Sequence, residues 1–151
     1  MKQQVPIAVV GLGYFGRFHV QHLARHPNAR LVAVVDRKKD LARSVAREFG
    51  CTAFTDYRDV IGSVAAASVV APTQHHFSMA RDLIEAGIDV LVEKPMTHDE
   101  PTAVALAETA QRTGRILQVG HIERFSSCFK EMSRLVERPH YIESNRIAPW
   151  R

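Results

Sequence analysis

The sequence predicts an α/β protein built on a doubly wound parallel sheet of about six strands. First, short apolar runs typical of strands covered on both faces alternate with amphipathic helical stretches along most of the chain. Second, the glycine turn Gly11–Gly16 directly follows the first apolar run. Third, polar residues follow the fourth, fifth and sixth runs where each run ends. That is where ligands bind in an open α/β sheet.

The composition is that of an ordinary globular domain. The chain has 151 residues, of which 46% are hydrophobic and 24% charged, and a net charge of +4. Its basic residues are scattered, so we expect no nucleic-acid partner. No apolar run approaches the roughly 18 residues of a membrane span, and no targeting segment precedes the first strand. Cys51 and Cys128 lie far apart, which indicates neither a metal site nor a redox pair and favours a cytoplasmic location.

The first half of the chain is expected to form three strands, each followed by a helix. Pro27 stops the first helix, Gly50 caps the second, and Asp56 can cap the third, which is short. In chain order, the elements are strand Val5–Val10, helix Tyr14–His26, strand Leu31–Val35, helix Lys39–Phe49, strand Thr52–Phe54 and helix Asp56–Ile61.

The second half is expected to add three more strands. Gly87 and Gly114 close the two intervening helices. In chain order, the elements are strand Ala66–Val70, helix Gln74–Ala86, strand Asp89–Val92, helix Asp99–Thr113 and strand Ile116–Val119.

The last thirty or so residues differ from this alternation. Ser126–Val136 has the pattern of a helix, Pro139 breaks it, and Tyr141–Ile147 has the pattern of a strand that is more polar than the other six. We interpret them as the first helix and strand of a C-terminal α+β domain whose remainder the sequence does not contain. The predicted domains are therefore 1–123 and 124–151.

The glycine turn indicates a dinucleotide site and hence a Rossmann-type sheet. Gly11 allows the tight turn, Gly13 lets a pyrophosphate approach the backbone, and Gly16 lets helix and strand pack closely. Free N–H groups at the start of the helix would then face the phosphates. The alternative is a glycine-rich turn in another kind of α/β protein.

Asp36 ends the second strand, 20 residues after the last glycine of the turn. Its carboxylate can accept hydrogen bonds from both hydroxyls of an adenosine ribose, and it would repel a 2′-phosphate. We therefore expect NAD rather than NADP, although the neighbouring Arg37 could pair with that phosphate. The alternative is that Asp36 only caps the end of its strand.

Lys94 is the candidate catalytic residue, because it follows a buried strand beside the expected nicotinamide. A lysine there can donate to a substrate hydroxyl or exchange its proton, and Glu93 could hold it in place. The alternative is a salt-bridged loop lysine. His121 and Arg124 are candidate substrate-binding residues after the sixth strand, although Glu123 and Arg124 could simply pair at a helix start.

Three histidines, His19, His22 and His26, share one helix at helical spacing. No carboxylate or cysteine accompanies them, so the pattern favours a helix face near the glycine turn over a metal site. We therefore expect no bound metal.

The motifs G-L-G-Y-F-G, V-V-D, A-P-T-x-x-H, E-K-P and G-H-I-E-R-F together resemble the N-terminal half of the Gfo/Idh/MocA oxidoreductases. The version with I-E-S-x-R is similar to the nucleotide-sugar members, the UDP-N-acetylglucosamine 3-dehydrogenase group. The resemblance implies NAD(P)-linked oxidation of a sugar hydroxyl to a ketone. The cofactor-binding residues it implies, with Arg37 from the reasoning above, are Gly11, Gly13, Tyr14, Phe15, Gly16, Asp36, Arg37, Ala71, Pro72, Thr73, His76, Glu93 and Lys94.

Members of that family continue into a second, mainly antiparallel domain that carries most of the sugar pocket and usually the oligomer interface. The resemblance therefore implies a sugar or nucleotide-sugar dehydrogenase whose cofactor domain, alone, has little turnover. We expect a homo-oligomer, with residues 141–147 as a candidate contact. The alternative function is a non-catalytic dinucleotide-binding module, such as a redox sensor or a partner subunit.

Overall fold

The computed structural model of the chain describes residues 4–143, 145 and 147. It divides into two compact units, one ending at Gly120 and the other beginning at His121. Each unit is described by itself. The predicted boundary after residue 123 stays a prediction about where the folding domains separate.

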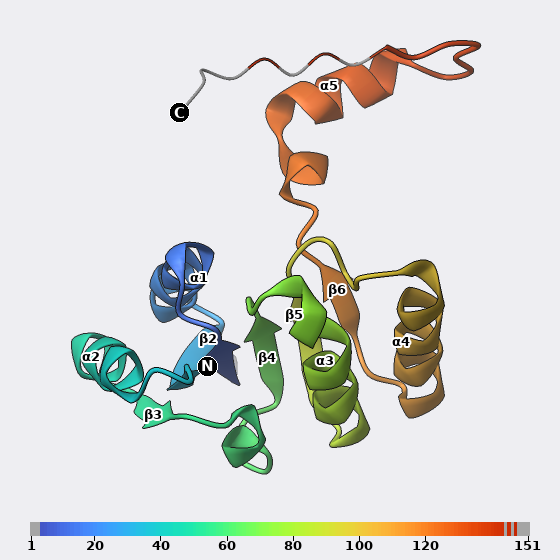
Figure 1. The fold of residues 1–151 in the computed structure, drawn as a ribbon. Helices are drawn as coiled ribbons and strands as arrows, with labels where there is room; N and C mark the ends of the chain where they lie inside the picture. The colour runs from blue at the N-terminus through green and yellow to red at the C-terminus, as the bar shows by residue number, and fades with distance from the viewer. Residues whose placement is uncertain (1–3, 144, 146, 148–151) are drawn as a thin grey trace. The chain divides into compact units, whose positions relative to one another are not determined.

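The first unit contains one sheet of six parallel strands in the order β3-β2-β1-β4-β5-β6, as Figure 1 shows. The order runs outward in both directions from the central pair β1 and β4, so the topological switch point lies between them. This confirms the predicted fold class. The strands are β1 Val5–Val10, β2 Ala29–Val35, β3 Thr52–Phe54, β4 Ala66–Val69, β5 Asp89–Val92 and β6 Leu117–Val119.

The register brings the carboxyl ends of the central strands level with one another. Val10 of β1 pairs with Val35 of β2 and with Val69 of β4, and Val69 pairs in turn with Val92 of β5. The loops after these four strands therefore emerge along one edge of the sheet.

The helices cover the two faces unequally. α1 and α2 pack on one face, whereas the 3₁₀ turn η1, α3 and α4 pack on the other. The 3₁₀ turn η2 leads directly into α3. Their bounds are α1 Tyr14–Arg25, α2 Lys39–Phe49, η1 Tyr57–Val60, η2 Thr73–His75, α3 His76–Glu85 and α4 Glu100–Thr113.

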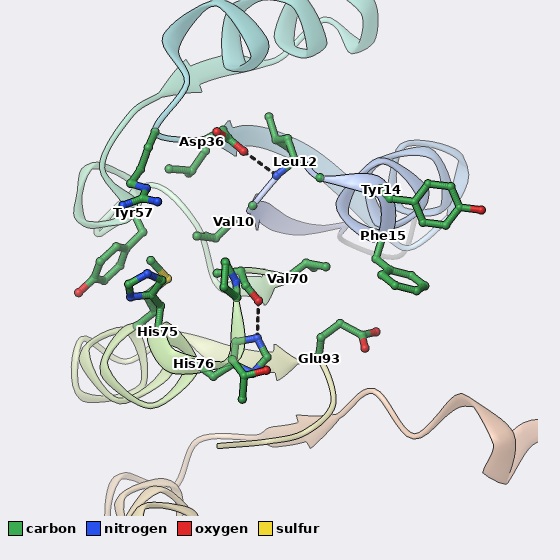
Figure 2. A pocket seen from close by; sticks show the side chains of 18 of the residues that line it. Val10, Leu12, Tyr14, Phe15, Asp36, Tyr57, Val70, His75, His76 and Glu93 are labelled. Atoms are coloured by element: carbon green, nitrogen blue, oxygen red, sulfur yellow. Dashed lines mark hydrogen bonds between the residues drawn. The ribbon is translucent and has the colours of Figure 1, made fainter. Parts of the chain in front are cut away.

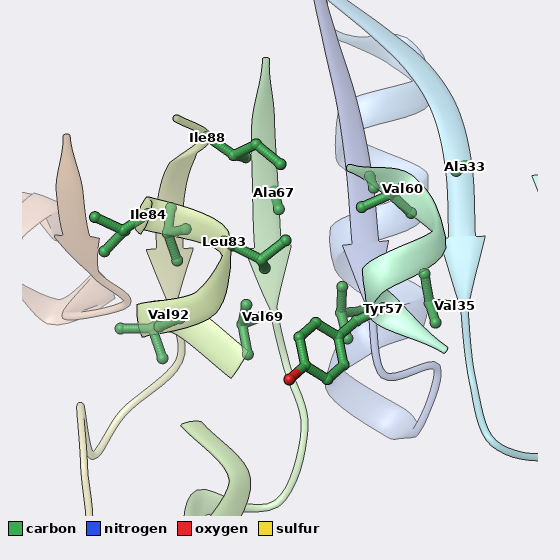
Figure 3. Close-up of a cluster of buried hydrophobic side chains, with 14 of the residues drawn as sticks. Ala33, Val35, Tyr57, Val60, Ala67, Val69, Leu83, Ile84, Ile88 and Val92 are labelled. Atoms are coloured by element: carbon green, nitrogen blue, oxygen red, sulfur yellow. The ribbon is translucent and has the colours of Figure 1, made fainter. Parts of the chain in front are cut away.

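The core is divided by the sheet into two clusters, because successive strand residues point to opposite faces. Val9 and Val34 pack with α1 and α2. Val10 and Val35, their immediate neighbours, belong to the larger cluster on the other face. Figure 3 shows this second cluster, with Leu83 packed against the strands.

The predicted elements differ from the observed ones mainly at their ends. The short helix predicted at Asp56–Ile61 is the 3₁₀ turn η1, and Asp56 does cap it by accepting a 2.9 Å hydrogen bond from the backbone N–H of Arg58. The predicted helix Gln74–Ala86 is divided into η2 and α3. Asp99 caps α4 through the Thr102 N–H.

The second unit begins with the 3₁₀ turn η3, Ile122–Phe125, and continues as α5, Ser127–Leu135, which Ser126 caps. The predicted strand Tyr141–Ile147 is not formed over its described residues, 141–143, 145 and 147; positions 144 and 146 lie outside the described residues. Tyr141 is 80% exposed and Ile147 95% exposed. A strand needs a partner for its backbone and a surface for its apolar side chains, and these residues have neither here.

Candidate functional site

A cleft of about 550 Å³ lies at the sheet edge where β1, β2, β4 and β5 end. Figure 2 shows Asp36 and Tyr57 on one side of it and Phe15 and Glu93 on the other. All predicted cofactor-binding residues except Gly16 line the cleft. The lining residues from that prediction are Gly11, Gly13, Tyr14, Phe15, Asp36, Arg37, Ala71, Pro72, Thr73, His76, Glu93 and Lys94.

A side chain at each of the three glycines of the turn would meet a different environment. Gly11 has a φ of +93°, and a Cβ there would come 2.6 Å from the Val70 carbonyl oxygen. Gly16 is buried, and a Cβ there would overlap the Gly11 carbonyl oxygen. A Cβ on Gly13 would meet no atom of the chain within 4 Å. Gly11 and Gly16 are therefore required by the fold, whereas Gly13 leaves open space in the cleft.

The N-terminus of α1 is open to an anion. Gly13 is the N-cap residue and provides no side chain to cap the helix, and the first turn carries no acidic residue. The first N–H groups of the helix therefore keep their hydrogen-bonding capacity, and the helix dipole favours negative charge there. Together with the open space at Gly13, this arrangement fits the pyrophosphate of a dinucleotide.

Asp36 is fixed by the backbone on both of its carboxylate oxygens. Oδ2 accepts a 2.9 Å hydrogen bond from the Leu12 N–H, and Oδ1 accepts one of 2.9 Å from the Lys38 N–H. Asp36 thus holds the glycine turn against the end of β2. Because a carboxylate oxygen can accept more than one hydrogen bond, both oxygens can still receive a ribose hydroxyl.

His76 joins two of the loops that form the cleft. His76 is 1% exposed, and its ring lies between two carbonyl oxygens, with Nε2 2.6 Å from that of Ala71 and Nδ1 2.9 Å from that of Pro95. Figure 2 shows the first contact. The ring therefore ties the loop after β4 to the turn after β5, and the predicted role of His76 in lining the cofactor site stays a prediction.

Lys94 extends its side chain over an aromatic ring rather than toward a carboxylate. Nζ lies 5.6 Å from the centre of the Phe15 ring. Among the described residues, no ion pair involves Lys94. Glu93 instead accepts a 3.0 Å hydrogen bond from the backbone N–H of Lys94. The alternative of a salt-bridged loop lysine thus finds no support in this geometry.

Two further residues of this region, His19 and Ser68, were not predicted as site residues. His19 Nε2 lies 3.2 Å from Glu93 Oε1, and His19 Nδ1 lies 2.8 Å from Ser68 Oγ. One feature of the sequence pointed to Ser68, because it interrupts an otherwise apolar strand. His19 had been placed only on a helix face near the glycine turn.

His121 and Arg124 belong to the second unit, so their substrate-binding role stays a prediction. Over the part of the chain that is described, no group of three or more His, Cys, Asp or Glu side chains is arranged to hold a metal ion. The same residues include no helix long and apolar enough to span a bilayer.

A sequence profile described as "Oxidoreductase family, NAD-binding Rossmann fold", that of Gfo/Idh/MocA, matches residues 5–121. The chain belongs to this family. It carries the family's NAD-binding Rossmann domain, as the glycine turn and the E-K-P motif predicted.

Two curated relatives have similar identity to this chain. The UDP-N-acetylglucosamine 3-dehydrogenase of Acidithiobacillus ferrooxidans is 36% identical over 144 residues, which cover 95% of this chain and 45% of that protein. The scyllo-inositol 2-dehydrogenase (NAD(+)) of Bacillus subtilis is 36% identical over 141 residues, which cover 91% and 41%. The chain thus spans less than half the length of these relatives.

Solved structures show the same fold. The A. ferrooxidans enzyme superposes with a TM-score of 0.82 at 35% identity, covering 87% of this chain and 43% of the other. GenD2 from gentamicin A biosynthesis, solved in complex with NAD, superposes with a TM-score of 0.85 at 31% identity, covering 89% and 39%. The relatives are thus sugar and inositol dehydrogenases and related oxidoreductases.

Proposed function

We propose that this chain is the NAD-binding part of a dehydrogenase that oxidises a hydroxyl of a nucleotide sugar to a ketone, with the hydride passing to NAD from the carbon that bears the hydroxyl. The observation that carries the proposal is Lys94, a lysine of the cleft lining without an ion pair among the described residues. Its Nζ lies over the ring of Phe15, which Figure 2 shows across the cleft from Asp36. A bound NAD would supply the hydride acceptor. As the hydride leaves, the neutral amine of Lys94 would accept the proton of the substrate hydroxyl.

The cleft supports one orientation of the cofactor. Asp36 would accept the adenosine ribose hydroxyls, and the open helix terminus at Gly13 would hold the pyrophosphate. The nicotinamide would then extend toward Phe15, Glu93 and Lys94. The A. ferrooxidans relative, named for UDP-N-acetylglucosamine, supports the choice of a nucleotide sugar. His121 and Arg124 are proposed as further substrate contacts.

The proposal can be tested in a chimera. Residues 1–120 of this chain would replace the matching part of the A. ferrooxidans enzyme, and NADH formation from UDP-N-acetylglucosamine would be followed by absorbance. We expect turnover that a Lys94→Ala change reduces by at least about a hundredfold, the size of a general acid–base contribution. Calorimetry would establish that both chimeras bind NAD.

Two results would contradict the proposal. A folded, NAD-binding chimera without turnover would favour the alternative, a non-catalytic dinucleotide-binding module. Equal rates in the chimera and in its Lys94→Ala variant would show that Lys94 takes no part in the reaction.

A cytoplasmic location and a homo-oligomeric state also remain proposals.

A further inference from the structure

Three polar side chains form a continuous chain of contacts at the Lys94 end of the cleft. His19 comes from α1, Ser68 from within β4 and Glu93 from the position just after β5. The ring nitrogens of His19 touch both partners, with 2.8 Å between Nδ1 and Ser68 Oγ and 3.2 Å between Nε2 and Glu93 Oε1. His19 therefore links the helix of the glycine turn to the loop of the candidate catalytic lysine.

The chemistry of the three groups fixes the direction of these hydrogen bonds. An ionised carboxylate can only accept, so Nε2 carries the proton and donates to Glu93. In the neutral ring, Nδ1 then accepts from the Ser68 hydroxyl. Ser68 is 0% exposed, so no substrate can reach its oxygen. The order serine–histidine–carboxylate is that of a hydrolase triad, but this one can only hold its members in place.

Glu93 is confined on its remaining sides as well. Its second oxygen, Oε2, accepts the backbone N–H of Lys94, and its side chain is 13% exposed. Gly120, just after β6, leaves room for the carboxylate, since a Cβ there would come 2.7 Å from Oε1. The carboxylate thus points at His19 and the peptide of Lys94.

The confinement of Glu93 has an electrostatic consequence for Lys94. A carboxylate paired with the ammonium would keep the amine protonated and occupy its hydrogen bonds. With Glu93 turned toward His19, Lys94 Nζ is left over the Phe15 ring, where a substrate hydroxyl can reach it.

We propose that His19 is a positioning residue that keeps the Glu93 carboxylate away from the Lys94 ammonium, with Ser68 orienting its ring. The importance of this positioning for catalysis rests on the proposed role of Lys94. The positioning itself rests on the contacts of His19, Ser68 and Glu93.

The reactivity of Lys94 tests the proposal without any substrate. The full chain would be acylated with trace acetic anhydride, and the rate at Lys94 would be compared by mass spectrometry with that at exposed Lys39. An ion pair of up to about 1 kcal/mol corresponds to about a fivefold change. We therefore expect His19→Ala to lower the Lys94/Lys39 ratio about three- to fivefold. His19→Gln, whose amide can still donate to Glu93, should restore it.

Matched variants distinguish a specific effect on the position of the Glu93 carboxylate from a general loosening of the fold. His22→Ala alters an exposed histidine of the same helix and should leave the ratio unchanged. Gly120→Ala should lower it with His19 intact, because its Cβ displaces the carboxylate directly. In a Glu93→Gln background the effect of His19→Ala should vanish, since an amide carries no charge to pair with the ammonium.

An unchanged Lys94/Lys39 ratio in a folded His19→Ala would overturn the proposal, as would a persistent effect in the Glu93→Gln background. If His19→Ala does not fold, as judged by circular dichroism, His19→Phe, which keeps a ring but has no donor for Glu93, takes its place. The labelling result is independent of turnover. Failure of the chimera therefore counts against the proposed function, and failure of the labelling counts against His19.

Discussion

At the scale of single residues, the glycine turn separates two requirements that look identical in the sequence. Gly16 is needed because its neighbour is the backbone oxygen of Gly11, whereas Gly13 faces open space. The first is a requirement of folding and the second a requirement of binding. Substitution of Gly13 should therefore lower the affinity for the cofactor, whereas substitution of Gly16 should lower the stability of the fold.

Gly13→Ala is expected to leave the free energy of unfolding within about 0.5 kcal/mol of the original, the range of neutral surface changes. Its φ of −64° is accessible to alanine. NAD affinity should nevertheless fall about tenfold or more, because the new methyl group occupies the space of the pyrophosphate and disturbs its hydrogen bonds. Gly16→Ala should instead cost about 1–3 kcal/mol of stability. Urea unfolding and calorimetry measure the two effects, and a destabilised Gly13→Ala would contradict the assignment.

Asp36 is expected to make NAD bind more tightly than NADP. Asp36→Ala should weaken NAD binding by about 1–3 kcal/mol, the range for losing charge-assisted hydrogen bonds. Asp36 also accepts the backbone N–H of Leu12, so a glycine turn loosened by the substitution would lower the affinities for NAD and NADP equally. Loss of the ribose contact would instead reduce the difference between the two affinities. Calorimetric titration with both cofactors distinguishes these, with Asp40→Ala as the control. Tighter binding of NADP by the unaltered chain would refute the preference.

At the scale of elements, one hydrogen bond joins η1 to α3. The Tyr57 hydroxyl donates to Asp82 Oδ2 at 2.6 Å. The pKa of Tyr57 is raised from 10.0 to about 12, chiefly by burial and further by the hydrogen bond and negative charge of Asp82. The same hydrogen bond lowers the pKa of Asp82. The protonated phenol is thus part of how η1 is attached to the helix beside it.

The free energy of unfolding should therefore fall at high pH as the Tyr57 hydroxyl loses its proton. The folded-state pKa of Tyr57 lies above its unfolded value, so its contribution is complete below about pH 10 and is lost as the pH rises through about 12. Urea unfolding across this range should show the fall in the unaltered chain, and Tyr57→Phe should show a smaller one. Absorbance near 295 nm reports the phenolate. An equal fall in both proteins would exclude Tyr57 as its cause.

The elements were predictable where the signal is local. The apolar runs, the glycine turn and the caps Gly50 and Asp56 each depend on a few neighbouring residues, and the structure has them near the expected positions. The strand expected at 141–147 depends instead on a partner strand that its own residues cannot specify. Local pattern alone therefore overestimates regular structure at such a segment.

The same distinction applies to the site. The glycine turn, Asp36 and Lys94 were found because each follows a strand end, and strand ends of a parallel sheet meet at one edge. The contact of His19 with Glu93 spans 74 positions. It arises from how α1 crosses the sheet, which no spacing rule reports, and only the isolated polarity of Ser68 hinted at it.

At the scale of the whole molecule, three of the described residues after Pro139 are apolar and exposed. They are Tyr141, Ile142, which is 68% exposed, and Ile147. We predict that residues 141–147 either exchange their amide hydrogens rapidly in a monomer or pair as strands between two copies. Light scattering would distinguish a monomer from a dimer, and hydrogen exchange would measure the protection of these amides. A monomer with strongly protected amides there would contradict both alternatives.

The strand order also has a consequence for how the chain folds as it is synthesised. β1 leaves the ribosome before the other five strands of the sheet but lies in its middle, and one of its two neighbours is β4, which begins at Ala66. Until that later segment emerges, one edge of β1 stays unpaired, and such edges attract other chains. Nascent chains arrested before β4 should therefore be digested by protease far more readily than chains arrested after β6.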